Sequence, residues 1–92
     1  MDIQQKDNGN EGLFYIELEG KIVGRMTYTW MGSDRIVINH TIVDDVLKGK
    51  GAGKQLVSKA VDFARAKGIK IVPVCSFAKS VFEKVDEFKD VL

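Results

Sequence analysis

Residues 35–75 decide the fold, and they read RIVINHTIVDDVLKGKGAGKQLVSKAVDFARAKGIKIVPVC. Arg35 to Val43 is rich in β-branched residues, which predicts a strand. After Gly53 the apolar residues recur at helical spacing, and Gly68 stands where a glycine commonly ends a helix. Ile69 to Cys75 is a nearly unbroken apolar run of strand length, which is typical of a strand covered on both faces. Strand, helix and strand in this order predict a βαβ unit whose strands are parallel neighbours.

The sequence on either side of this unit completes the predicted fold. Upstream, Leu13 to Leu18 and Ile22 to Trp30 alternate in character and are joined by a glycine turn, which predicts an antiparallel meander. The polar segment 1–12 could add a short edge strand. Downstream, apolar residues at helical spacing over 77–92 predict a final amphipathic helix. We therefore expect a single α/β domain over residues 1–92, with a mixed sheet built from the meander and the βαβ unit.

Composition narrows the class of protein. The 92 residues carry 14 Lys and Arg against 13 Asp and Glu, and this net charge of +1 disfavours a uniformly basic nucleic-acid binder. A single cysteine forms no internal disulfide, which suits the reducing cytosol. The polar N-terminus does not resemble a secretory signal, and no apolar run approaches the ~20 residues of a membrane span. We expect a cytoplasmic protein with neither a membrane nor a nucleic acid as partner.

The glycine-rich turn Lys48 to Lys54, KGKGAGK, is the strongest chemical signal. It follows a predicted strand and opens a predicted helix, where free amides, the helix dipole and lysine side chains together favour an anion such as phosphate or pyrophosphate. The competing interpretation is a tight turn with solvated lysines. A P-loop does not fit because Gly49 and Gly53 are one residue too close, and the glycine spacing also differs from the dinucleotide-binding fingerprint.

Lys48 to Gly53 resembles the acyl-coenzyme A signature [QR]-x-x-G-x-[GA] of the GNAT superfamily of N-acetyltransferases, with Lys in the first position. Ala78 to Lys84 is similar to the A-x-x-L-Y-x-K helix of that family. The chain looks like the very small members of the superfamily, which keep the cofactor-binding half. It lacks the elements that shape the acceptor site in larger relatives, so an oligomer or a protein substrate could complete that site.

The resemblance implies acetyl-coenzyme A as donor, an amine of a small molecule or protein as acceptor, and no metal. The backbone of Ile42 and Val43 would pair with the pantetheine arm, and the two parallel strands would separate at Pro73. The pyrophosphate would be held by the turn, whose residues are Lys48, Gly49, Lys50, Gly51, Ala52, Gly53 and Lys54.

Two side chains are candidates for catalysis. Phe82 stands where many relatives carry a tyrosine that protonates the leaving thiolate. Either no residue has this role in the present chain, or another residue has taken it. Cys75 could supply the proton, or could accept the acetyl group itself as a thiolate; otherwise it is a packed apolar side chain. His40, the only histidine, could act as general base and pair with Cys75 across adjacent strands.

The placement of His40 also permits a structural role. Regular alternation puts it on the face of Ile36, Ile38 and Ile42, where a lone histidine is more often a core residue, with Asn39 and Thr41 pointing the other way. At the level of function, two further classes stay open. One is a non-catalytic acyl-coenzyme A binding or sensing module, and the other, supported only by the lysines of the turn, is a nucleic-acid module.

Overall fold

The chain forms a five-stranded sheet with its strands in sequence order. The computed structural model describes residues 1–92. The first four strands pair antiparallel and the last pairs parallel to its neighbour. The strands are β1 (Gln4–Asp7), β2 (Glu11–Leu18), β3 (Lys21–Met31), β4 (Arg35–Val43) and β5 (Lys70–Pro73). This sheet confirms the predicted mixed α/β fold, including the short edge strand in the polar N-terminal segment.

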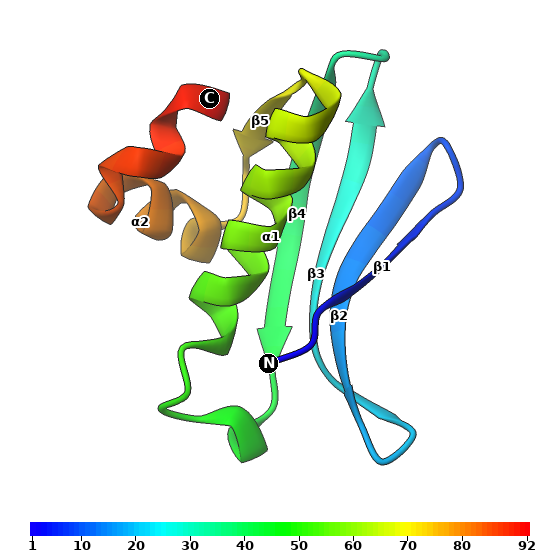
Figure 1. Ribbon diagram of the computed structural model, residues 1–92, viewed down its shortest axis with the longest axis vertical. Coiled ribbons are helices and arrows are strands. Elements are labelled where there is room, and N and C mark those ends of the chain that lie inside the picture. Colours follow the sequence, from blue (N-terminus) through cyan, green and yellow to red (C-terminus); the bar gives the residue numbers. More distant parts are fainter.

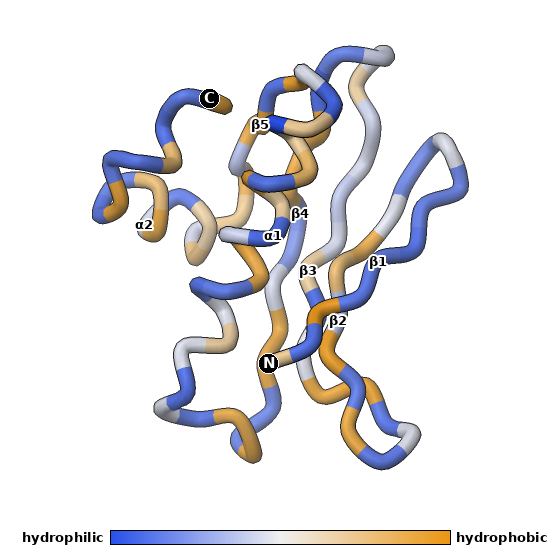
Figure 2. Tube along the Cα trace, in the orientation of Figure 1, coloured by the Kyte–Doolittle hydropathy of each residue, from blue (hydrophilic) through white to orange (hydrophobic).

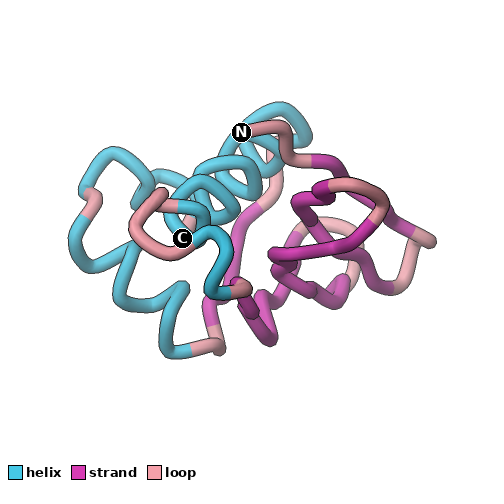
Figure 3. Tube along the Cα trace, turned by 90° about the horizontal axis from the view of Figure 1, so that it is seen from below, coloured by secondary structure: helices cyan, strands magenta, loops and turns pink.

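The helices all lie on one face of the sheet, as the end-on view shows (Figures 1 and 3). Helix α1 (Ala52–Lys67) connects β4 to β5 and is preceded by a 3-10 turn, η1 (Asp45–Leu47). Its apolar face is fully buried against the sheet, and Gly68 ends it with a left-handed φ of 68° as predicted. None of the helices is long and apolar enough to cross a membrane.

The predicted C-terminal helix is divided in two. Helix α2 (Ser76–Lys84) ends at Val85, whose backbone is extended, and a 3-10 segment, η2 (Asp86–Val91), follows. Phe82 of α2 packs edge-on against Phe88 of η2 at 6.4 Å between ring centroids, and Phe82 is 2% exposed. The break lets η2 fold back so that its apolar residues join the core, which one straight helix would carry away from it.

The core lies between the sheet and the helices. It combines alternate residues of the strands with the apolar face of α1, whereas β1 is hydrophilic (Figure 2). At its rim, Asp7 accepts hydrogen bonds from the hydroxyl of Tyr28 at 2.5 Å and the indole of Trp30 at 2.9 Å. Gly12 makes this contact possible, because a Cβ there would collide with the Tyr28 hydroxyl.

Burial and hydrogen bonding shift the pKa values of both Tyr28 and Asp7. Burial raises the pKa of Tyr28 well above its usual range, and the hydrogen bond to Asp7 adds to the effect. Burial alone would also raise the pKa of Asp7. Hydrogen bonds from Tyr28, the Gly9 amide and Trp30 outweigh it, and the pKa of Asp7 is lowered.

Candidate functional site

The glycine-rich turn leaves backbone amides free at the start of α1. Gly49 and Gly51 have φ values of 78° and 68°, which other residues adopt only with strain. Gly51 is the N-cap of α1 and has no side chain that could cap the helix. The first amide of the helix that has a backbone acceptor is that of Gln55, which donates to the Gly51 carbonyl at 3.1 Å. The amides of Ala52, Gly53 and Lys54 therefore have no protein acceptor, as an anion-binding turn requires.

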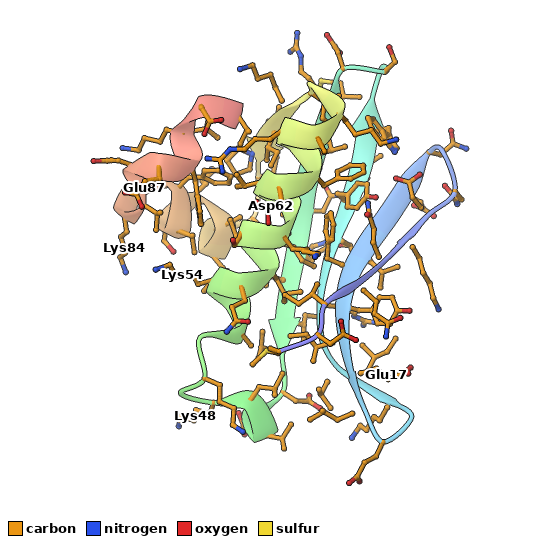
Figure 4. The ribbon with its side chains drawn as sticks, viewed as in Figure 1. Glu17, Lys48, Lys54, Asp62, Lys84 and Glu87 are labelled. Atoms are coloured by element: carbon orange, nitrogen blue, oxygen red, sulfur yellow. The ribbon has the colours of Figure 1, made fainter.

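A groove of about 670 Å³ opens beside these amides, between the turn and α2. Its lining includes Lys48, Lys54 and Lys84 but no acidic residue, and none of these lysines is in an ion pair. Figure 4 shows Lys54 of α1 and Lys84 of α2 on the same side of the molecule. Sequence reasoning missed Lys84, whereas Lys50, which it included, does not line the groove.

Gly53 has a second role that the motif did not reveal. It is buried, and a Cβ at this position would collide with the ring of Phe77 in α2. Phe77 is 41% exposed and lines the groove together with Ser80 and Val81 on the same helix. The missing side chain at Gly53 thus lets the Phe77 ring lie directly against the start of α1. Phe82, by contrast, points into the core.

The two parallel strands separate at Pro73. Their pairing runs from Arg35 opposite Lys70 to Ile38 opposite Pro73. The carbonyl of Ile38 then accepts the amides of both Val74 and Cys75, at 3.0 and 3.1 Å, and β4 continues to Val43 with no strand beside it on that side. Proline ends β5 because it has no amide to donate. The separation predicted at this point is therefore present, and it exposes one edge of residues 39–43.

A β-bulge in β4 overturns the predicted orientation of His40. Tyr28 pairs with Ile38 and Thr27 pairs with His40, so Asn39 is an extra residue between them. Because paired residues share a face, His40 lies with Thr27 on the outer face, and Thr41 lies with the buried Met26 on the helix face. Regular alternation predicted the reverse. His40 is exposed and is not a core residue.

Thr41, and not His40, faces Cys75. The Thr41 hydroxyl is 3.4 Å from the Cys75 sulfur, and Thr41 also lines the groove. Cys75 is half-buried and caps α2, since the Ala78 amide donates to its sulfur at 3.3 Å. The sulfur thus lies at the positive end of the α2 dipole. The sequence holds no local signal for this pair, because the bulge that orients Thr41 depends on how β3 pairs with β4.

Comparison with known proteins gives one family. The family model of the GCN5-related N-acetyl-transferases matches residues 13–91. The solution structure of a GCN5-like protein from Staphylococcus aureus is 39% identical, with a TM-score of 0.73 over 96% of this chain and 85% of that one. No curated protein matches the sequence.

Two crystal structures of lower identity share the fold. A ribosomal-protein-alanine N-acetyltransferase from Brucella melitensis biovar Abortus 2308 is 19% identical, with a TM-score of 0.69. A Bacillus anthracis structure assigned as a streptothricin acetyltransferase, in complex with acetyl coenzyme A, is 20% identical, with a TM-score of 0.59. The matches cover 85% and 73% of this chain but only 62% and 39% of those larger chains.

Proposed function

The chain belongs to the family of GCN5-related N-acetyltransferases, whose reaction is acyl transfer to an amine, and we propose that it uses acetyl coenzyme A as donor. The observation that carries the proposal is the set of unbonded amides at Ala52, Gly53 and Lys54, which open on a groove that is lined by three lysines and has no acidic residue. These residues fit a diphosphate. The similar fold from Bacillus anthracis, solved with acetyl coenzyme A, supports the same donor.

The groove also suits the remainder of the donor. From the turn it runs to Thr41 and Val43 on the strand edge that β5 leaves free, where the backbone of Ile42 and Val43 can pair with an amide-bearing arm. The bound donor supplies an activated acetyl thioester. We place the reactive end of that arm beside Thr41, whose hydroxyl is 3.4 Å from the sulfur of Cys75.

We assign the proton transfers to His40 and Cys75. His40 takes a proton from the acceptor ammonium, so that the neutral nitrogen can attack the acetyl carbon. Cys75 either gives its proton to the departing sulfur or, as a thiolate, accepts the acetyl group and passes it to the amine. The bulge turns His40 to the outer face of the sheet, whereas Cys75 contacts Thr41 on the helix face, so each acts separately and they do not form a Cys–His pair.

Calorimetric titration with acetyl coenzyme A tests the proposal. We expect one site per chain and, at a hundredfold excess over Kd, about 2.7 kcal/mol of added stability, visible as a higher Tm. Lys59→Glu serves as a control, because Lys59 is an exposed residue of α1 outside the groove. A donor that neither binds nor stabilises the protein refutes the proposal. Binding without release of coenzyme A, across peptides, amino acids and polyamines, would instead identify a binding or sensing module.

A further inference from the structure

Two side chains, Arg65 of α1 and Lys70 of β5, connect η2 to the rest of the fold. The guanidinium of Arg65 donates from Nε and Nη2 to the two carboxylate oxygens of Asp90, at 3.0 and 2.7 Å. The same Nη2 also donates to the backbone carbonyl of Glu87. Nζ of Lys70 donates to the backbone carbonyl of Asp90 at 2.8 Å. These four hydrogen bonds form the Arg65–Asp90 clamp.

The clamp supplies what η2 lacks by itself. η2 is a 3-10 segment of six residues, and 3-10 runs longer than about four residues are uncommon because their internal hydrogen bonds are poorly aligned. An isolated exposed ion pair would add little. Here, however, one guanidinium makes a two-bond fork with a carboxylate, and two further bonds go to backbone carbonyls. The clamp therefore fixes the backbone of η2 against the C-terminal end of α1 (Figure 1).

η2 begins where one wall of the donor groove ends. The residues of α2 and its C-cap that line the groove are Phe77, Ser80, Val81, Lys84 and Val85. Val85 is also the N-cap of η2, so no linker separates the wall from η2. The buried ring of Phe82 packs edge-on against Phe88 of η2, and Val91 of η2 is 3% exposed. The second half of α2 and η2 therefore pack as one unit.

The two ends of α2 are held in different ways. At its start, Cys75 caps the helix and the Phe77 ring lies against Gly53. At its end, Lys84 is exposed and makes no ion pair, so the position of this end depends on η2. The free amides of the turn lie at one end of α1, and the clamp lies at the other end of that helix of 16 residues. The chain of contacts through α1, η2 and α2 thus starts and ends at the groove.

We propose that Arg65 and Asp90 are positioning residues of the donor groove, because their ion pair holds η2 on α1 and so sets the distance of Lys84 and Val85 from the free amides. This inference rests on the proposed function. Neither Arg65 nor Asp90 lines the groove, so neither touches the donor. Without the clamp, the end of α2 that carries Lys84 can move away from the turn, and the donor binds more weakly.

Calorimetric titration with acetyl coenzyme A, well below the Tm of every variant, tests the positioning role. Arg65→Gln should raise Kd about two- to fivefold. Lys89→Gln is the matched control, because it removes the same charge from an exposed residue whose ion pair, with Asp86 at 2.8 Å, lies within η2. An unchanged Kd in Arg65→Gln overturns the inference, even if Tm falls, since the clamp would then serve stability alone. An equal rise in Lys89→Gln also overturns it.

Asp90→Asn gives a test in which charge and position predict opposite signs. The donor is an anion, so removal of a negative charge would by itself lower Kd. Loss of the clamp should instead raise Kd, whereas Asp86→Asn should leave it unchanged or lower it. The double variant Arg65→Gln with Asp90→Asn should bind about as weakly as Arg65→Gln alone, because the two residues act through one contact. A Kd for Asp90→Asn at or below that of the wild type overturns the inference.

Hydrogen exchange without donor separates this inference from the proposed function. The Val85 amide donates to the Val81 carbonyl at 2.9 Å, so its exchange reports on the end of α2 at the groove. Arg65→Gln should accelerate this exchange and Lys89→Gln should not, while the Gln55 amide at the start of α1 stays protected in both. Unchanged exchange at Val85, or equal acceleration at Gln55, overturns the positioning role. If Val85 responds as expected but acetyl coenzyme A does not bind the wild type, the proposed donor is wrong and the clamp still positions the groove.

Discussion

The hydroxyl of Thr41 lies 3.4 Å from the sulfur of Cys75, across the point where β4 and β5 separate. The two residues are 34 positions apart, and three features of the fold bring them together: the bulge at Asn39, the end of β5 at Pro73, and the cap that Cys75 provides for α2. The contact belongs to the end of the groove where the thioester is proposed to lie.

Thr41→Val should lower kcat and leave the Kd for acetyl coenzyme A nearly unchanged. Valine has the shape of threonine but cannot hydrogen-bond the Cys75 sulfur, so only a positioning effect is lost. Thr41→Ser, which keeps the hydroxyl, should restore most of kcat. Equal losses in both variants would show that the side chain acts through packing alone.

Cys75→Ser distinguishes the two roles proposed for the thiol. Serine keeps the cap on the Ala78 amide, so the fold should persist, and Tm should change little. If Cys75 is an acyl carrier, mass spectrometry of the wild type with donor and no acceptor should show one added acetyl group, which the variant lacks. If it is an acid, no adduct forms and only kcat falls. Unchanged turnover in Cys75→Ser and Cys75→Ala would rule out both roles.

Charge reversal at the groove should weaken donor binding. Lys54→Glu and Lys84→Glu should each raise the Kd for acetyl coenzyme A by about fivefold, since each places a negative charge beside the bound phosphates. The effect should diminish as salt is added, because screening weakens interactions between exposed charges. Titration at two ionic strengths checks both points. If neither charge reversal changes the Kd for acetyl coenzyme A, the phosphates bind outside this groove.

Gly53→Ala should reduce donor binding more than stability. The added methyl group collides with the Phe77 ring, which is partly exposed and can swing aside into the groove. Alanine also favours the helix by about 1 kcal/mol, which offsets part of the lost contact. The double variant Gly53→Ala with Phe77→Ala should recover binding, so a double-mutant cycle of Kd values tests the coupling. If the effects of the two substitutions on the free energy of donor binding are additive, the contact between Gly53 and Phe77 does not govern binding.

The Asp7–Tyr28 pair should limit stability at both ends of the pH scale. The pKa of Asp7 is lowered in the folded protein, so its contribution is present above its ordinary value of 3.8 and is lost as pH falls through the folded pKa. The pKa of Tyr28 is raised, so its contribution is present below its ordinary value of 10.0 and is lost as pH rises above it.

Urea unfolding across pH measures this dependence. Asp7→Asn should flatten the acid side of the stability curve, and Tyr28→Phe should flatten the alkaline side. Asp2→Asn is the control, since Asp2 is exposed and has no hydrogen bond or ion pair. If Asp7→Asn leaves the acid side as steep as in the wild type, the pair does not govern acid unfolding.

Most of the fold follows from local pattern. Four features could be predicted because each depends on periodicity or backbone chemistry within a few residues. They are the bounds of β4, the apolar face of α1, the glycine at the C-terminus of α1 and the strand break at Pro73. The glycine-rich turn belongs to this group, since positive φ values and free amides are properties of the turn itself.

The sequence by itself determined the mixed sheet and the glycine-rich turn at the start of α1, whereas the tertiary structure decided which side chains meet. His40 and Thr41 exchanged their predicted faces because a bulge depends on how β4 pairs with β3, and side-chain direction reverses with a shift of one residue. Lys84 and Phe77 line the groove because α2 packs beside the start of α1. No periodicity within one segment encodes such contacts, since they form only when the helices and the N-terminal hairpin settle on the sheet.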